Sequence, residues 1–468
     1  MIQSFHLPAL PHLSTTTWSY GRGKARVDLR IPQLTPALLR SQTEALLEAQ
    51  ERHLVSRPVR EIVEVIGRVA ARLADPADPL RQTAEAALPV VTGYSAPMIT
   101  QVLDTMTADW SVDRLWELLR EEFGDPTVLD TFRPRPAARG QTRAFGPRLA
   151  THIFSGNVPG VAVTSIIRSL LVKSATLGKT AAGEPLLPAL FAQGLAEVDA
   201  ELGACVAVTY WPGGDEALER VALSPAEVVV VYGENDTVAA VRTRAPAKAR
   251  FLGYGHKLSF GVIGREALSA EQSASAAARA ALEVATFDQQ GCVSPHLFYV
   301  EEGGDTAPAE WALQLAAAMA DAECTLPRGA LSPREATAIR QLRGEAEFAQ
   351  IGGRGVELHT SAEGTAWTVI YDPDPAFCAS CLNRVVRVKP VPRLESVPAL
   401  VASIGSFLQT VGVAAESARV LWLASALGRL GASRIAPLGQ MAWPPPSWHH
   451  DGHPPLRGMV RWCDVETS

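Results

Sequence analysis

Residues 148–180, RLATHIFSGNVPGVAVTSIIRSLLVKSATLGKT, decide the class of fold that we expect. The run Thr151–Phe154 predicts a strand that ends in a glycine-containing turn, and a helix is expected to begin near Val161. The run Leu170–Gly178 predicts the next strand. A strand, a helix and another strand in this order are typical of a parallel βαβ unit, so the stretch predicts an α/β fold.

The same alternation of strands and helices continues as far as Gly264 and predicts a doubly wound sheet. On the amino side, Thr35–His53 and Ser56–Ala74 repeat apolar residues three and four apart, which predicts amphipathic helices with a role in packing and oligomer contact. The further β-branched runs before Gly264 are Cys205–Tyr210, Val228–Tyr232 and Ser259–Ile263.

A second α/β pattern follows. An alanine-rich helix over residues 270–286 leads to the loop Phe287–Pro295 and then to the strand His296–Val300. A helix that delivers a loop with a lone cysteine, Cys292, is a setting in which nucleophilic cysteines occur. The remaining segments of the pattern are Trp311–Met319, Ser332–Glu347, Ala366–Tyr371, Arg384–Val391 and a last helical unit at Ser417–Arg434.

Composition excludes several classes of protein. The 468 residues, 47% of them hydrophobic and 20% charged, are enough for two or three globular domains. A formal net charge of -6 provides no general basic surface, so we expect no nucleic-acid partner. Six dispersed cysteines suggest the reducing cytoplasm and not a disulfide framework. We find no secretory signal at Met1–Leu10 and no apolar run long enough to span a membrane.

Several turns lie where parallel strands are expected to end, which is where open α/β sheets bind ligands. Asn157 can donate to a developing oxyanion, although such turns are more often purely structural. Lys179 can reach a ribose hydroxyl or a phosphate, or it can be an ordinary solvated charge. Pro212–Gly214 and Tyr232–Glu234 allow close approach of a cofactor, but neither matches the usual dinucleotide fingerprint.

The cysteines and histidines are ambiguous by themselves. A thiolate such as that of Cys292 attacks and leaves thioesters readily, yet a single cysteine is more often a small buried apolar residue. Cys378 and Cys381 have redox or zinc spacing without a second pair of ligands, so we expect a structural role. The cluster His449, His450 and His453 is equally compatible with a packed terminal segment, and we predict no metal site.

The order of these motifs resembles the aldehyde dehydrogenase superfamily. Within it, the sequence is most similar to the long-chain acyl-CoA reductase family, typified by the fatty acid reductase subunit of bacterial bioluminescence. The resemblance extends from about Arg148 to the carboxyl terminus and is loose before Gly140. The motifs that carry it are Phe287–Pro295, Ser155–Gly160, Val172–Lys179, Ile435–Gln440 and Trp448–Gly452.

The resemblance implies an aldehyde dehydrogenase-like fold of two doubly wound parallel-sheet domains, cofactor and catalytic, with the active site in the cleft between them. We expect a helical packing region at 1–140 that partly completes the cofactor domain, and a dinucleotide-binding domain at 141–265. We further expect a catalytic domain with the nucleophile at 266–435 and a tail at 436–468.

The resemblance also implies roles for individual residues. Cys292 matches the catalytic nucleophile and Asn157 the asparagine that helps stabilise the oxyanion. Lys179 matches the lysine that holds the cofactor ribose. The further residues expected at the dinucleotide are Pro212, Gly213, Gly233 and Glu234.

Two departures from the superfamily pattern refine this prediction. In Phe251–Lys257, Gly253 or Tyr254 stands where aldehyde-oxidising members keep a glutamate base, so water is poorly activated to hydrolyse an acyl-enzyme. Ala182 stands where NAD-selective relatives often carry a carboxylate. This favours NADPH, with NADH left open because Glu184 lies two residues further on.

We therefore expect a cytoplasmic, NADPH-dependent reductase that forms an aldehyde from an acyl-CoA or acyl-carrier thioester through a Cys292 acyl-enzyme. His256 and His450 are candidate proton donors. An acyl-protein synthetase is a candidate partner, and a homo-oligomer is expected by family analogy. The alternatives are an NAD(P)-dependent aldehyde dehydrogenase and an acyl-accepting scaffold subunit.

Overall fold

The computed structural model describes residues 1–135 and 139–466. Its chain divides into two compact units. Unit 1 consists of Met1–Thr92, Ile99–Gly255 and Pro445–Ser468, and unit 2 of Gly93–Met98 and His256–Pro444. The chain therefore passes between the units four times along its length.

Unit 1 is built on a five-stranded parallel sheet of order β10-β9-β6-β7-β8. Its central strands are buried on both faces, as the all-buried run VVVVY of β9 illustrates. The strand order reverses between β6 and β9, which is the switch point of a doubly wound sheet. The strands are β6 (Leu149–Ile153), β7 (Ala175–Lys179), β8 (Val206–Thr209), β9 (Val228–Tyr232) and β10 (Arg250–Tyr254).

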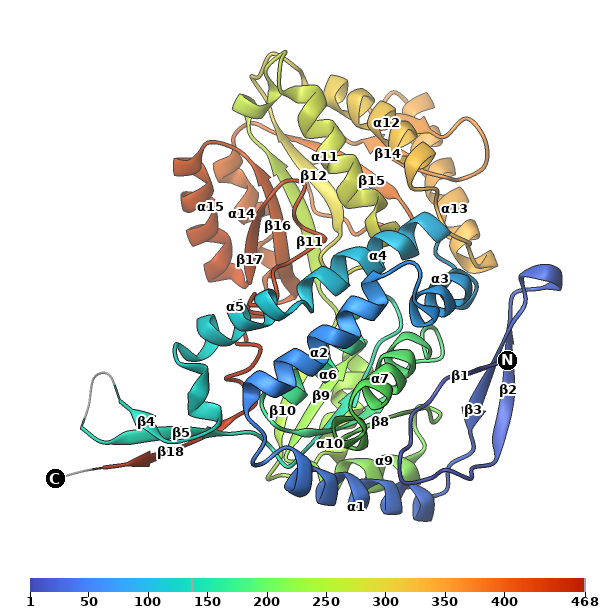
Figure 1. The fold of residues 1–468 in the computed structure, drawn as a ribbon. Helices are drawn as coiled ribbons and strands as arrows, with labels where there is room; N and C mark the ends of the chain where they lie inside the picture. Colours follow the sequence, from blue (N-terminus) through green and yellow to red (C-terminus); the bar gives the residue numbers. More distant parts are fainter. Residues whose placement is uncertain (136–138, 467–468) are drawn as a thin grey trace. The chain divides into compact units, whose positions relative to one another are not determined.

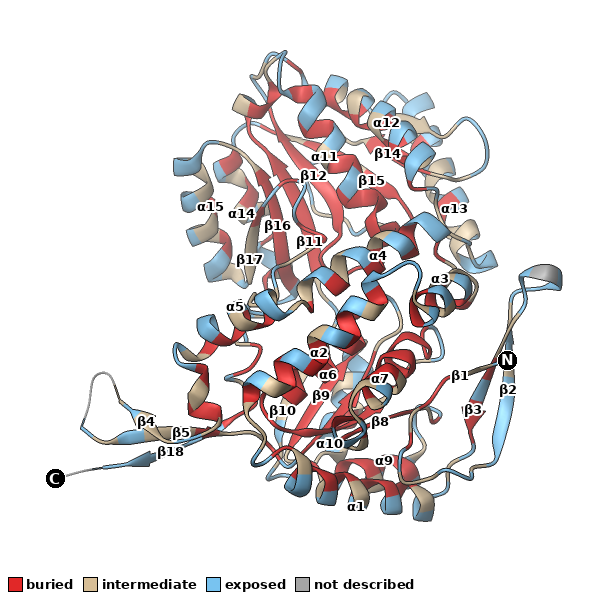
Figure 2. Ribbon diagram, in the orientation of Figure 1, coloured by how far each residue is buried: buried red, intermediate tan, exposed pale blue. Residues whose placement is uncertain are grey.

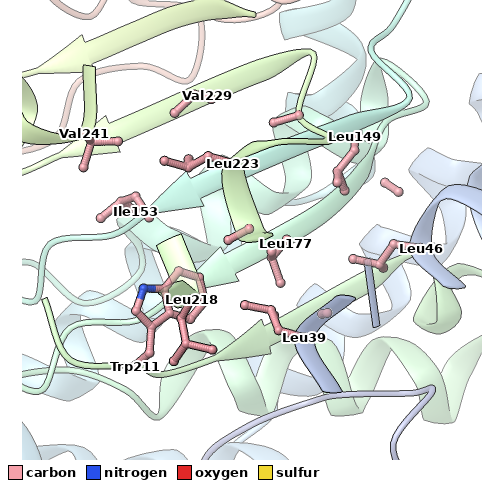
Figure 3. Packing of buried hydrophobic residues seen from close by; sticks show 14 of the residues in the cluster. Leu39, Leu46, Leu149, Ile153, Leu177, Trp211, Leu218, Leu223, Val229 and Val241 are labelled. Atoms are coloured by element: carbon pink, nitrogen blue, oxygen red, sulfur yellow. The ribbon is translucent and has the colours of Figure 1, made fainter. Parts of the chain in front are cut away.

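Helices cover both faces of this sheet (Figure 1). On one face, Leu39 and Leu46 of α1 pack with Leu218 of α9 and Val241 of α10 into the core drawn in Figure 3. The crossover helices are α6 (Val161–Leu171), α7 (Leu187–Val198), α8 (Ala200–Ala204), α9 (Glu216–Leu223) and α10 (Asn235–Arg244). The amino-terminal helices are α1 (Pro36–His53), α2 (Val59–Ala74), α3 (Pro79–Thr92), α4 (Ala96–Asp109) and α5 (Val112–Phe123), with 3-10 turns at Gly23–Ala25 and Pro126–Leu129.

Two small sheets complete unit 1. An amino-terminal ribbon has the order β1-β3-β2. An arm has the order β18-β5-β4, in which the last strand of the chain pairs with residues 141–145 (Figure 1). The ribbon consists of β1 (Ile2–Gln3), β2 (Thr15–Tyr20) and β3 (Val27–Pro32). The arm consists of β4 (Arg133–Pro134), β5 (Gln141–Phe145) and β18 (Arg461–Val465).

Unit 2 is built on a seven-stranded sheet of order β13-β14-β15-β12-β11-β16-β17, in which only the edge strand β13 runs antiparallel. Figure 2 shows that its central strands are buried. The strands are β11 (Leu258–Ile263), β12 (Pro295–Glu301), β13 (Glu357–Thr360), β14 (Thr368–Tyr371), β15 (Val385–Val391), β16 (Leu408–Ala414) and β17 (Arg434–Pro437).

The helices of unit 2 also lie on both faces of its sheet. Leu423 and Leu427 of α15 and Val397 of α14 pack on one face, whereas α11 and α12 pack together elsewhere in the unit. The helices are α11 (Ser273–Ala285), α12 (Pro308–Thr325), α13 (Pro333–Ile351), α14 (Val397–Leu400) and α15 (Ser417–Leu430). The 3-10 turns are η3 (Arg265–Leu268), η4 (Thr286–Gln289), η5 (Leu394–Ser396) and η6 (Ala402–Phe407).

These elements refine the expectations drawn from sequence. The predicted strand Leu170–Gly178 begins too early, because α6 continues to Leu171 and the chain then turns at Lys173, whose φ is 62°. The expected boundary at residue 265 falls instead at Gly255, since β11 pairs with β12 and β16 of unit 2. In the described residues, none of the helices is long and apolar enough to cross a membrane.

Candidate functional site

The loop after β6 carries Asn157 at the switch point of the unit 1 sheet. Asn157 is exposed. A Cβ at Gly156 would lie 3.0 Å from the backbone nitrogen of Glu184, so the absence of a side chain lets the loops after β6 and β7 approach. Gly160 caps α6 with a φ of 95°, a conformation that favours glycine. The local sequence thus holds Asn157 at the carboxyl edge of the sheet, where ligands bind in such folds.

The glycines expected at the cofactor lie beside the same edge. Nothing lies within 4 Å of a Cβ placed on Gly213, and a Cβ on Gly233 would make only ordinary contact with Thr237. Protein packing therefore does not require glycine at either position, and both leave room for a ligand. Glu234 caps α10 directly after Gly233, and Pro212 precedes Gly213 in the loop after β8.

Lys179 is the last residue of β7. Its Nζ lies 5.6 Å from the ring centre of Tyr210, and in the described residues no carboxylate lies within ion-pair distance of it. Burial lowers the pKa of Lys179, and the nearby Glu219 carboxylate opposes this shift. A half-buried ammonium without a close counter-charge is suited to an anionic group.

The Glu184 side chain is turned into the protein. It is buried, and its Oε1 accepts hydrogen bonds from the backbone N–H groups of Leu186 (2.9 Å) and Leu187 (2.7 Å) at the start of α7. Burial raises the pKa of Glu184 to about 7. This carboxyl group is therefore not available to ribose hydroxyls, and Ala182 leaves the turn after Lys179 without another.

Cys292 lies in unit 2, three residues before β12 and thus at the amino edge of that sheet. The chain reaches it through Phe287, Asp288 and Gln289, which have φ values of 55°, 48° and 67°. Three consecutive left-handed residues other than glycine are costly and persist only where surrounding contacts hold them. The contacts of this segment therefore determine where the cysteine stands.

A second left-handed segment, Leu382–Arg384, holds the first. The buried Arg384 donates Nε to Oδ1 of Asp288 at 2.8 Å, and the backbone N–H of Gly329 donates to Oδ2 at 3.0 Å. The backbone N–H of Asn383 donates to the carbonyl oxygen of Asp288 at 3.1 Å. Burial raises the pKa of Asp288, which the cation of Arg384 opposes. We call this arrangement, Asp288 with Arg384, the loop clamp.

Gln289 extends the clamp into the sheet. Its Nε2 donates to the carbonyl oxygens of Pro295 (2.7 Å) and Val385 (3.0 Å), and its Oε1 accepts from the N–H of Val385 at 3.0 Å. The side chain thus acts as a backbone bridge between β12 and β15. Gln290 donates to Asn383 at 3.1 Å and ties the two loops once more.

The segment Gly93–Met98 supports the same loop from a distant part of the sequence. The hydroxyl of Tyr94 donates to the carbonyl oxygen of Phe287 at 3.2 Å, and the Phe287 N–H lies 3.4 Å from Sδ of Met98. On β11, the Ser259 hydroxyl donates to the carbonyl oxygen of Cys292 at 2.7 Å and accepts from the N–H of Thr410 at 3.1 Å. Sequence reasoning missed these supports because partners far apart in sequence leave no local pattern.

The opposite, carboxyl edge of the unit 2 sheet is occupied by ion pairs. Nη1 and Nη2 of Arg419 both donate to the buried Glu301 at 2.7 Å, and Arg265 donates to it at 2.8 Å. Burial alone would raise the pKa of Glu301, but these hydrogen bonds lower it to about 2. The end of β12 at this edge is therefore occupied by ion pairs, whereas Cys292 lies at the amino edge.

The candidate proton donors belong to different units. His256 precedes β11, with its ring 6.4 Å from that of Phe407. Burial lowers the pKa of the neighbouring His296 to about 4, and His256 adds to this shift. In unit 1, His450 stacks between Tyr254 (4.3 Å) and Trp448 (4.6 Å). His450 is thereby fixed beside the carboxyl end of β10.

Neither Gly253 nor Tyr254, which the resemblance aligns with the glutamate base of aldehyde-oxidising members, offers a carboxylate. A Cβ on Gly253 would lie 2.8 Å from Phe251 and from Val238, so a longer side chain would require both to shift. Tyr254 is buried and stacks on Tyr232 at 4.8 Å, and burial raises its pKa, which keeps the phenol neutral near pH 7. Unit 1 therefore supplies no carboxylate base from this segment.

Cys378 and Cys381 have the spacing of a redox or zinc pair. Burial raises the pKa of Cys381, the partner of Cys378 in the predicted pair. Within the described parts of the chain, no disulfide forms and no cluster of histidine, cysteine and carboxylate residues could hold a metal ion.

Comparison with known proteins defines first the class and then the family. Aldehyde dehydrogenase 21 from Physcomitrella patens has a TM-score of 0.76 at 14% identity and covers 99% of this chain and 98% of its own. The aldehyde dehydrogenase KauB from Pseudomonas aeruginosa gives 0.76 at 12% identity, with 98% and 95% covered. The chain thus has the aldehyde dehydrogenase fold, which confirms the predicted fold class.

The long-chain acyl-protein thioester reductase of Photorhabdus luminescens is 26% identical over 441 residues, which are 92% of this chain and 86% of that protein. Its counterpart in Aliivibrio fischeri is 26% identical over 397 residues, or 82% and 78%. The family model described as "Acyl-CoA reductase (LuxC)" matches residues 54–462. The chain belongs to the acyl-CoA reductase (LuxC) family.

This membership confirms the predicted family and makes the chain an oxidoreductase of acyl thioesters. Family and fold together imply a nicotinamide cofactor. The residues of unit 1 fit such a group, because Gly213 and Gly233 leave space at the carboxyl edge and Lys179 offers a cation there.

Proposed function

We propose that this protein reduces fatty acyl thioesters to aldehydes with NADPH, through an acyl group carried on Cys292. The observation that carries the proposal is the segment Gly253–Tyr254, which offers a packed glycine and a neutral phenol in place of a base. A thioacyl enzyme that water cannot readily hydrolyse survives until it is reduced. The family membership supports the same direction of reaction.

In the proposed reaction, the Cys292 thiolate bonds to the acyl carbonyl carbon while the Asn157 amide donates to the oxygen that becomes negative. Collapse breaks the bond from that carbon to the carrier sulfur, and the carrier leaves as a thiol with a proton from His256 or His450. When bound, NADPH supplies the hydride that reduces the Cys292 thioester. Asn157 stabilises the second oxyanion, whose collapse breaks the carbon–sulfur bond, frees the thiolate and releases the aldehyde.

The preference for NADPH over NADH rests on charge. Lys179 is available to a 2′-phosphate, whereas Glu184 is turned into the protein and Ala182 has no carboxylate to accept ribose hydroxyls. Pro212, Gly213, Gly233 and Glu234 would hold the rest of the dinucleotide. Comparison of the two cofactors in one assay tests this preference, and equal kcat/KM values would contradict it.

The acyl donor is proposed to be coenzyme A or an acylated protein. The relatives are named acyl-protein thioester reductases, which makes an acyl-protein synthetase a candidate partner. If Cys292 only receives an acyl group and turnover needs that partner, the scaffold reading is favoured. If an aldehyde is instead oxidised to a free acid without a thiol acceptor, the dehydrogenase reading is favoured.

The test combines NADPH consumption across a series of acyl-CoA thioesters with intact-protein mass after acyl-CoA is added without cofactor. We expect one acyl adduct and oxidation of NADPH. Cys292→Ala should lose the adduct while it keeps cofactor binding. Cys324→Ala, on the exposed side of α12, is the matched control and should retain both. An adduct that persists in Cys292→Ala would remove Cys292 from this role.

We also propose that the protein is a homo-oligomer. Every residue of β18 is exposed and the strand forms an edge of the arm sheet, with Trp462 and Val465 more than 40% exposed. Native proteins usually cover or pair such an edge. A second copy of the chain is the partner that supplies this cover.

A further inference from the structure

The amino-terminal ribbon is fixed to the edge of the unit 1 sheet. His6 and Val208 exchange two backbone hydrogen bonds of 2.8 Å, which adds the start of the chain to the free side of β8. The Ser4 hydroxyl donates to the carbonyl oxygen of Pro185 at 2.7 Å, and Gln193 donates to that of Phe5 at 2.9 Å. The ribbon is thus held beside the loops that follow β7 and β8.

One face of β2 carries two aromatic side chains toward those loops. Trp18 and Tyr20 are half-buried, whereas Thr17 and Ser19, which alternate with them along the strand, are exposed, as the strand period requires. The ring of Trp18 meets that of Tyr210 edge to face at 4.6 Å. Neither Trp18 nor Tyr20 is among the residues of the core cluster drawn in Figure 3.

Tyr20 reaches the turn that follows Lys179. Its hydroxyl donates to the carbonyl oxygen of Ala182 at 2.9 Å. Burial raises the pKa of Tyr20 to about 12, with smaller effects from Tyr210 and Glu184, so the hydroxyl remains a donor. The same turn contains Glu184, whose carboxyl group is bound inward to the start of α7. Tyr20 therefore fixes a turn that presents no negative side chain.

Lys179 completes this arrangement. Its Nζ lies near the ring of Tyr210, on which Trp18 also packs. An ammonium beside two half-exposed aromatic rings combines a cation for a phosphate with surfaces for a planar base. In doubly wound sheets the loop after the second strand lies at the cofactor ribose. The second strand of this sheet is β7, and Tyr210 follows the third strand, β8.

We propose that the ribbon is part of the cofactor site and selects NADPH: Trp18 with Tyr210 binds the adenine end, and Tyr20 positions the turn that borders the 2′-phosphate held by Lys179. Trp18 acts as a binding residue and Tyr20 as a positioning residue. The inference rests on the proposed use of NADPH, and it assigns a role to a segment far from the dinucleotide motifs.

The test measures binding of 2′,5′-ADP and 5′-AMP to the full chain by calorimetry. Trp18→Ala should weaken both ligands about tenfold, and Trp18→Phe should stay within about threefold of the native chain. Tyr20→Phe should weaken 2′,5′-ADP more than 5′-AMP, because only the turn at the phosphate loses its support. Trp422→Ala, at an exposed tryptophan of α15, is the matched control and should leave both unchanged.

The outcomes separate this inference from the proposed function. Native binding of 2′,5′-ADP that Trp18→Ala leaves intact would overturn the role of the ribbon and leave the reductase proposal standing. A native chain that binds neither NADPH nor 2′,5′-ADP would overturn both. The acyl adduct on Cys292, measured by mass without cofactor, should be unchanged in the ribbon variants, which also shows that they are folded.

Discussion

Glu184 illustrates how a single side chain changes a prediction about a cofactor. In the sequence, the Glu184 carboxylate lies close enough to Lys179 that NADH is left open as the cofactor. In the structure its Oε1 caps the start of α7 through Leu186 and Leu187, and the group is buried. A charged carboxylate in this position is costly, which has a consequence for stability.

Glu184 should make the protein less stable as pH rises. Its pKa in the folded state is about 7, above the ordinary 4.5, so the folded state holds a proton that the unfolded state loses. The stabilisation is complete below pH 4.5 and is lost as pH rises through 7. The Glu184→Gln variant lacks this titration. Its free energy of unfolding should therefore rise relative to that of the native chain by about 3 kcal/mol over this range.

Urea unfolding between pH 4.5 and pH 8 measures this difference. Glu347→Gln, on an exposed position of α13, is the control and should give a flat difference. A flat difference for Glu184→Gln as well would mean that the carboxyl group is solvated in the folded protein.

The residues of the site were predictable to different degrees. Asn157, Lys179 and Cys292 lie in or next to turns that border apolar runs, so the local sequence is enough to propose them, and their roles stay predictions. Tyr94 and Ser259 were missed, because each acts on a carbonyl group of the cysteine loop from a distant part of the chain. No local pattern encodes a contact of that kind.

At the scale of elements, the cysteine loop is held by the loop clamp. The clamp joins two left-handed segments, 287–289 and 382–384. Both store backbone strain that the local sequence does not relieve. The buried Arg384 also donates to Glu323 at 2.7 Å, so one guanidinium ties the loop to α12. The clamp is therefore expected to matter for stability and for acylation.

Arg384→Met should destabilise the protein by about 3–5 kcal/mol, because it leaves Asp288 buried without its cation. Acylation of Cys292 should also slow, since the loop loses the contact that fixes it. Urea unfolding and time-resolved intact mass measure the two effects. The double variant Asp288→Asn/Arg384→Met should recover part of the stability, and no recovery would show that the two side chains are not coupled.

Elements with a clear pattern were predicted well. α1 and β9 match their predicted ranges closely because amphipathic and continuous apolar runs are strong signals. The strands β10 and β16 were missed. Each contains glycine and lies next to turn-forming residues, so pairing with neighbouring strands and not local propensity defines them.

At the scale of the whole molecule, the exposed edge of the arm should govern assembly. Ending the chain at Val460 removes β18 and should convert the proposed oligomer into smaller species. Sedimentation velocity measures the change. Leu421→Lys, at an exposed apolar residue of α15, is the control and should keep the native assembly. A native chain that sediments as a monomer would contradict the proposal.

The division of the chain into five stretches has a consequence for how this gene can be divided or recombined. A fragment that stops at Gly255 lacks the last stretch of unit 1, with His450 and β18, and a fragment that starts at His256 lacks Tyr94. Neither half encodes a complete unit. Independent exchange of a cofactor module by gene fusion is thereby disfavoured, and the two units are expected to be inherited and to fold as one piece.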